Sequence, residues 1–190
     1  MTQSTISTPV AAVHSLAWTA CMAALISVGA FLMFPIFAVP FTMQTFFVLL
    51  AGFILGPVQG ALAIILYIAA GLAGLPVFSG GKSGYLALVG PTGGFFLGFL
   101  LAVLATGLAS QRGKESAKVK GPVVLFVYGL VALVLLFAPG ILWFHQWMEG
   151  KLTLWEATAA MGPFFGLDII KLIGAVTAYR FLVRQRLTPL

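Results

Sequence analysis

The stretch GLAGLPVFSGGKSGYLALVGPTGG, Gly71 to Gly94, breaks an otherwise apolar sequence with closely spaced glycine and proline. Ten of its 24 residues are of these two types, which supply positive φ angles and fixed turns, so no long helix or strand is expected to run through it. Lys82 is its one charged residue, and the stretch keeps apolar side chains that a solvated loop does not need. It is either an external loop or a segment that folds back and lines a site, because irregular backbone in a bilayer needs protein or water to satisfy it.

The composition identifies an integral membrane protein. Of the 190 residues, 61% are hydrophobic and 7% are charged, and the mean hydropathy is +1.12. A span needs about 20 apolar residues, so one membrane domain over residues 1–190 with six spans is near the limit of the length. The single Cys21 excludes an intrachain disulfide. No Lys or Arg precedes the first apolar run, so that run is expected to be a span and not a secretory signal.

The apolar runs predict an all-α protein, a compact bundle of six transmembrane helices with an irregular Gly/Pro-rich outer segment between the third and the fourth. The predicted spans are 16–34, 41–55, 58–75, 94–108, 121–144 and 163–182. Pro163 is expected in the first turn of the last span, after an outer connection over 146–161. The short second span and the Gly/Pro interruption are typical of a solute site built from discontinuous helices. Tilted neighbouring helices also produce short spans.

The basic residues collect on one side of this arrangement. One face receives seven of them, namely Arg112, Lys114, Lys118, Lys120, Arg180, Arg184 and Arg186. The other face receives Lys82 and Lys151, while Lys171 lies within a span. Because cytoplasmic loops carry the excess of Lys and Arg, we expect a multi-pass protein of the plasma (inner) membrane with both termini in the cytoplasm. The 71–94 segment then opens to the outside.

Two opposite charges stand in the last span. Asp168, the only aspartate, precedes Lys171 by three positions, a spacing that puts both on one helix face. Counted from Pro163, they lie about 8 and 12 Å along the span. Ionisable residues at such depth usually face a bundle interior or a wet cavity and have a functional role. The alternative is a self-neutralised pair that only fixes helix packing.

Other polar groups cluster near the break or on the same side of the membrane: Thr42, Gln44, Tyr67, Ser79, Lys82, Tyr85 and Thr92. The turn 90–94, GPTGG, opens the fourth span with free N–H groups that suit an anion, although it is equally explained as a plain helix start. Ala20 and Ala24 give the first span a small-residue face for another helix, within this chain or in a partner. The sequence contains no HExxH or P-loop pattern, so neither metalloprotease chemistry nor ATP hydrolysis is expected.

The motifs GLPVFSGG, GPTGG, PFTMQTF and the D-x-x-K of the last span resemble BioY, the family of biotin-binding S components of energy-coupling-factor (ECF) transporters. The resemblance covers the chain from its first span to Lys171. It implies a six-helix bundle without enzymatic activity or cofactor, which binds biotin with high affinity from outside as a transported ligand. It also implies a transmembrane coupling protein and two cytoplasmic ATPases as partners, with Ala20 and Ala24 docking the coupling protein.

Biotin has a ureido ring, an apolar body and a carboxylate. We hypothesise that Asp168 accepts from the ureido N–H groups and that Lys171 donates to the ureido carbonyl or to the carboxylate. Aromatic side chains and the Gly-rich backbone enclose the body in this hypothesis. The whole predicted site is Asp168, Lys171, Gln44, Thr42, Phe41, Phe78, Ser79, Gly80, Gly84, Tyr85, Gly90, Pro91, Thr92, Gly93 and Tyr67. The alternatives are an S component for another vitamin, such as thiamine or riboflavin, and a small membrane enzyme acting on lipid.

Overall fold

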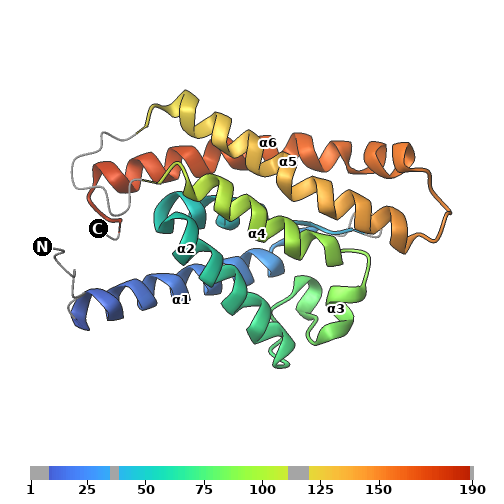
Figure 1. Ribbon diagram of the computed structural model, residues 1–190, viewed down its shortest axis with the longest axis horizontal. Helices are drawn as coiled ribbons and strands as arrows, with labels where there is room; N and C mark the ends of the chain where they lie inside the picture. The colour runs from blue at the N-terminus through green and yellow to red at the C-terminus, as the bar shows by residue number, and fades with distance from the viewer. Residues whose placement is uncertain (1–8, 35–38, 111–119, 189–190) are drawn as a thin grey trace, which may run out of the picture.

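The computed structural model describes residues 9–34, 39–110 and 120–188, and in this part the chain is almost entirely helical. Its long helices are α1 (Pro9–Phe31), α2 (Gln44–Leu72), α4 (Gly93–Gly107), α5 (Pro122–Trp147) and α6 (Leu154–Arg184). The helix α4 lies between α2 and α5, while α1 packs against α2 and α6 against α5 (Figure 1). The all-α class is therefore as predicted. Arg112, Lys114, Lys118 and residues 35–38 lie outside the described residues.

Four of these helices, α1, α2, α5 and α6, are long and apolar enough to cross a membrane, and α4 is a shorter apolar helix. Their outward faces are apolar as well. Val131, Val134, Ile170 and Ile173, on α5 and α6, each expose about half or more of their side chain. An exposed apolar surface of this extent matches a lipid environment.

The helix α2 is broken at Gly56, whose φ of 76° and ψ of 179° are not helical, directly before Pro57. The two arms fold back on each other, because the Gln44 side-chain amide donates to the Tyr67 hydroxyl at 2.8 Å. In a straight helix these residues would be about 35 Å apart. The break coincides with the boundary predicted between the second and third spans.

The stretch that follows α2 contains only short elements. The 3-10 turn η1 spans Ser79–Gly81, and α3 spans Tyr85–Val89 before α4 begins at Gly93. Phe78 is 2% exposed and fills the space next to Gly71, where a Cβ would lie 2.1 Å from its ring. Before α2, the chain forms a two-residue antiparallel pairing of β1 (Met33–Phe34) with β2 (Phe41–Thr42).

The expectation that Pro163 lies in the first turn of the last helix is wrong. Helix α6 begins at Leu154, and Pro163 lies inside it. Thr153 and Glu156 form a capping box, in which the Thr153 hydroxyl accepts from the Glu156 N–H at 3.2 Å and the Glu156 carboxylate accepts from the Thr153 N–H at 2.7 Å. This box satisfies the start of the helix ahead of the proline. Asp168 and Lys171 therefore lie about 21 and 26 Å along the helix, deeper than the sequence suggested.

Candidate functional site

One cavity opens between the helices on the side of the η1 and α3 segment. Every helix of the described chain except α1 contributes to its lining, and β2 and η1 close it. Its empty space is about 850 Å³ when the open mouth and the solvent in it are counted. The lining residues are Val39, Pro40, Phe41, Thr42, Gln44, Thr45, Tyr67, Phe78, Ser79, Lys82, Ala87, Pro91, Thr92, Phe95, Phe96, Phe99, Leu136, Phe137, Met161, Phe164, Asp168 and Lys171.

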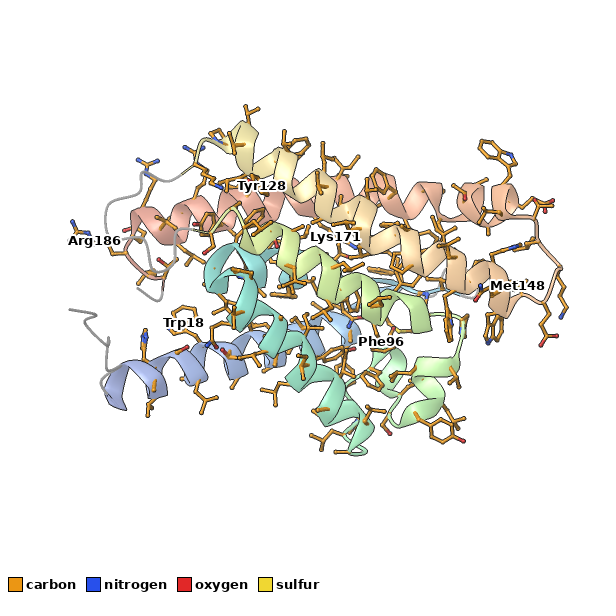
Figure 2. All side chains as sticks on the ribbon, viewed as in Figure 1. Trp18, Phe96, Tyr128, Met148, Lys171 and Arg186 are labelled. Carbon is orange, nitrogen blue, oxygen red and sulfur yellow. The ribbon has the colours of Figure 1, made fainter. Side chains whose placement is uncertain are left out.

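Lys171 and Asp168 provide the charge of this cavity. They are 7% and 3% exposed, and the Lys171 ammonium donates to a carboxylate oxygen of Asp168. The same ammonium donates to the Thr42 backbone carbonyl at 2.6 Å and lies 3.6 Å from the centre of the Phe41 ring. Figure 2 shows Lys171 inside the bundle, between the opposite ends marked by Arg186 and Met148. The pair is thus neutral as a unit and is directed into the cavity wall instead of toward lipid.

A short chain of hydrogen bonds continues from Lys171 along this wall. The Thr42 hydroxyl donates to the Gln44 side-chain oxygen at 3.3 Å, and the Gln44 amide donates to the Tyr67 hydroxyl at 2.8 Å. Gln44 and Tyr67 are 4% and 2% exposed. Because buried polar side chains are costly unless they are satisfied, this network fixes the positions of donors and acceptors at the cavity surface.

Aromatic rings form the apolar wall. Phe78 packs edge-to-face against Tyr67 and Phe96, with ring centres 5.4 and 4.9 Å apart. Phe41 lies 6.3 Å from Phe164, which comes from α6. The cavity thus joins a charged and hydrogen-bonding patch to a broad apolar surface, which suits an apolar ring compound that also carries polar groups.

The structure brings ten of the fifteen predicted site residues to this cavity: Phe41, Thr42, Gln44, Tyr67, Phe78, Ser79, Pro91, Thr92, Asp168 and Lys171. Five do not line it: Gly80, Gly84, Tyr85, Gly90 and Gly93. Tyr85 was expected to enclose the ligand, but it is 67% exposed. Two of the glycines act indirectly. The Gly90 carbonyl accepts from the Trp143 indole at 2.8 Å, and a Cβ on Gly93 would lie 1.8 Å from the Leu88 carbonyl, so both hold the turn that carries Pro91 and Thr92.

Several lining residues were missed from the sequence. Met161 and Phe164 precede Asp168 by seven and four positions, so they share its helix face with Lys171. This spacing could have identified both residues. It was overlooked because the last helix was expected to begin at Pro163, which left Met161 outside it. Phe95, Phe96 and Phe99 follow the GPTGG turn in the first turns of α4 and carried the same kind of signal. Thr45 belongs to the PFTMQTF motif and follows Gln44 directly, so it could have been included, whereas Val39 had no distinguishing pattern.

The predicted docking residues lie away from the cavity. Ala20 and Ala24 are both exposed on α1, so the helices of this chain leave that small-residue face uncovered. Other exposed residues of the helix, Leu16, Val28 and Phe31, are apolar.

The family profile named BioY matches residues 1–188. This chain belongs to the BioY family. It is 35% identical over 159 residues to the biotin transporter BioY of Rhodobacter capsulatus, covering 79% of this chain and 82% of that one. It is 36% identical over 152 residues to the biotin transporter BioY of Thermotoga maritima, covering 80% and 85%.

A solved structure also matches the fold. The chain superposes on the crystal structure at 2.1 Å of the S-component for biotin from an ECF-type ABC transporter, with a TM-score of 0.84 and 26% identity. The match covers 94% of this chain and 95% of the other. The resemblance to BioY that the sequence motifs indicated is therefore confirmed.

Proposed function

We propose that this protein takes up biotin as the substrate-specificity subunit of an ECF transporter, binding the vitamin in the cavity around Asp168 and Lys171. The observation that carries the proposal is the buried ion pair at the wall of an aromatic cavity, in a chain whose relatives are biotin transporters. ATP hydrolysis is supplied by partner subunits, and the protein itself is no enzyme.

The chemistry of biotin suits this cavity. Its ureido ring has two N–H donors and one carbonyl acceptor, which match a carboxylate and an ammonium that are held side by side. The Asp168 carboxylate accepts from the ureido N–H groups, and Lys171 donates to the ureido carbonyl or to the biotin carboxylate. Phe41, Phe78 and the other rings contact the apolar bicyclic body. Lys82 is exposed in the lining and is a second cation for an anionic group.

The direct test is a titration of the purified full chain with biotin, with binding measured by calorimetry. The variants Asp168→Asn and Lys171→Ala remove one charge each, and Glu149→Gln and Lys151→Ala make the same changes at exposed positions outside the cavity. We expect the first two to weaken binding about 10- to 100-fold, because each leaves a buried polar partner unsatisfied, while the controls bind like the wild type. Absence of biotin binding by the wild-type chain would refute the proposed function.

The other outcomes separate the alternatives. Unchanged affinity in both cavity variants would remove Asp168 and Lys171 from the site but leave biotin as the ligand. A rise in melting temperature with thiamine or riboflavin, and none with biotin, would indicate another vitamin. Turnover of a lipid that Asp168→Ala abolishes would indicate a membrane enzyme.

The proposal includes six membrane crossings, because the arms of α2 before and after Gly56 and the helix α4 are each counted as one. Crossings by twelve to sixteen helical residues are about 18 to 24 Å long, which requires local thinning of the bilayer or help from flanking segments. Both termini then lie in the cytoplasm of a plasma membrane protein, and the cavity opens outward through the 71–94 segment.

The partners in this proposal are a transmembrane coupling protein and two cytoplasmic ATPases. The uncovered face of Ala20 and Ala24 on α1 supports docking of the coupling protein, since small residues allow two helices to approach closely. Ala20→Leu and Ala24→Leu are expected to abolish co-purification with the coupling protein and to leave biotin binding unchanged. Retained co-purification would move the docking face elsewhere.

A further inference from the structure

A second groove lies between the first turn of α5 and the last turns of α6. Its lining shares no residue with the cavity and consists of Pro122, Val176, Thr177, Arg180, Phe181, Arg184 and Gln185. Both helix ends lie at the same end of the bundle, opposite the turn that joins α5 to α6 (Figure 1).

Arg180 and Arg184 dominate the charge of the groove. They are four positions apart on α6, so they share one face of the helix, and both are exposed. The carboxylates of the described residues are Glu149, Glu156 and Asp168, and the one ion pair recorded among them is that of Asp168 with Lys171. Within residues 9–34, 39–110 and 120–188, no carboxylate therefore neutralises the two guanidinium groups.

The position of the groove along α6 places it at the level of lipid headgroups. Between Glu156 and Arg180, α6 has 23 residues, a length of about 35 Å against a hydrocarbon core of about 30 Å. The end of the bundle that carries Glu156 also exposes Trp147 and Trp155, by 44% and 78%, as a membrane interface does. Arg180 and Arg184 consequently emerge at the opposite interface.

We propose that this groove binds the phosphate headgroup of an anionic phospholipid. Arg180 and Arg184 donate to phosphate oxygens, because a guanidinium presents paired donors that match this geometry. Phe181, which exposes 58% of its surface, contacts the apolar part of the same lipid, and the exposed Pro122 lies in the same lining. This exposed apolar surface favours a lipid over free phosphate. Two cations with no carboxylate partner among the described residues favour an anionic headgroup over a zwitterionic one.

The test measures phosphatidylglycerol retained by the purified full chain in native mass spectrometry, against phosphatidylcholine of the same chain length. Arg180→Gln and Arg184→Gln are compared with Arg186→Gln, an equal loss of charge at the same end but outside the groove. We expect the wild type to prefer phosphatidylglycerol and each groove variant to lose about fivefold in this preference. Arg186→Gln is expected to leave the preference unchanged.

Three results would overturn the proposal. Equal losses in all three variants would indicate diffuse attraction to the basic end of the molecule. If the wild type did not prefer phosphatidylglycerol to phosphatidylcholine, the groove would be assigned to a protein partner instead. Displacement of the lipid by inorganic phosphate alone would indicate a free-anion site. Helix content and gel filtration verify folding. If a glutamine variant misfolds, Arg180→Lys replaces it, and we expect it to keep the charge but lose part of the preference.

Discussion

Lys171 carries its ammonium group into the interior of the bundle, where a carboxylate, a backbone carbonyl and an aromatic ring surround it. An isolated charge in such a place is very costly, whereas a hydrogen-bonded pair compensates much of that cost. Asp168 and Lys171 thus depend on each other. The polar surface that they give the cavity exists only while both are present.

The first prediction concerns this dependence. Lys171→Met leaves the Asp168 carboxylate buried without its partner, and we expect the free energy of unfolding to fall by about 3–5 kcal/mol. The double variant Asp168→Asn with Lys171→Met removes both charges and is expected to lose clearly less. The stability of each variant is measured without ligand, by unfolding in mixed micelles with increasing dodecyl sulfate. If the double variant lost as much stability as Asp168→Asn alone and Lys171→Met alone added together, the two charges would not be coupled.

A matched pair at the surface provides the control. Glu149→Gln with Lys151→Met makes similar changes at two exposed residues of the turn between α5 and α6. Exposed charges contribute little to stability, so the unfolding curve should remain that of the wild type.

The spacing of Asp168 and Lys171 was sufficient to predict their contact, because three positions along a helix always bring side chains together. The other partners of Lys171 were not predictable in the same way. The Thr42 carbonyl is 129 positions away in the chain, and its contact with Lys171 depends on how β2 folds over α6. Local spacing carries no information about such a contact.

The helices α4 and α5 approach each other closely where glycine replaces a side chain. A Cβ on Gly98 would lie 2.4 Å from the Leu136 backbone carbonyl of α5, and a backbone atom cannot move aside as a flexible side chain can. Leu136 and Phe99, the neighbour of Gly98, both line the cavity. The separation of these two helices therefore affects the shape of the cavity as well as the packing.

The second prediction tests this contact. Gly98→Ala is expected to destabilise the protein by about 1–3 kcal/mol, as overpacked sites do, and to weaken biotin binding. Gly166→Ala is the control, because this helical glycine has no heavy atom within 4 Å of an added Cβ. The control should be neutral or slightly stabilising, since alanine favours a helix more than glycine does. Melting temperatures of both variants measure the difference, and equal melting temperatures would contradict the tight contact.

The start of α6 yields a third prediction. Thr153→Ala removes the cap that accepts from the Glu156 N–H, and we expect a loss of about 1 kcal/mol. Thr158→Ala is the matched control, because the Thr158 hydroxyl donates to the Leu154 carbonyl within the helix and caps nothing. Protease cleavage in the 150–156 region should rise only in the first variant. Similar cleavage of both would mean that the cap does not hold the helix start.

The prolines of α2 and α6 show which helix boundaries the sequence could predict. Gly56 with Pro57 was correctly interpreted as a break, because glycine there takes a φ and ψ that other residues avoid. Pro163 was interpreted as a helix start because proline often marks one, but it lies inside α6. A membrane helix tolerates an interior proline when neighbouring helices or side chains satisfy the backbone groups that the proline frees. Pro139 likewise lies inside α5. The capping pattern of Thr153 and Glu156 in the sequence was the better indicator.

At the scale of the whole molecule, the cavity depends on elements from most of the chain. Residues of β2 and of the first arm of α2 meet residues of α4, α5 and α6 around it. Helix α1 contributes no lining residue and leaves Ala20 and Ala24 exposed. This division separates the residues proposed to bind the ligand from those proposed to bind a partner, so each set can be mutated without the other.

The number of membrane crossings is the last prediction, and single cysteines can measure it. In a Cys21→Ser background, Val58→Cys marks the turn between the arms of α2, where Val58 is 68% exposed. Lys151→Cys marks the turn between α5 and α6, and Thr188→Cys follows the end of α6. With six crossings, a membrane-impermeant maleimide labels Val58→Cys and Thr188→Cys from the cytoplasmic side and Lys151→Cys from the outside. If the two arms of α2 entered the bilayer as a re-entrant hairpin without crossing it, Val58 would lie in the hydrocarbon core and remain unlabelled from both sides. Labelling after solubilisation in detergent verifies that all three thiols react.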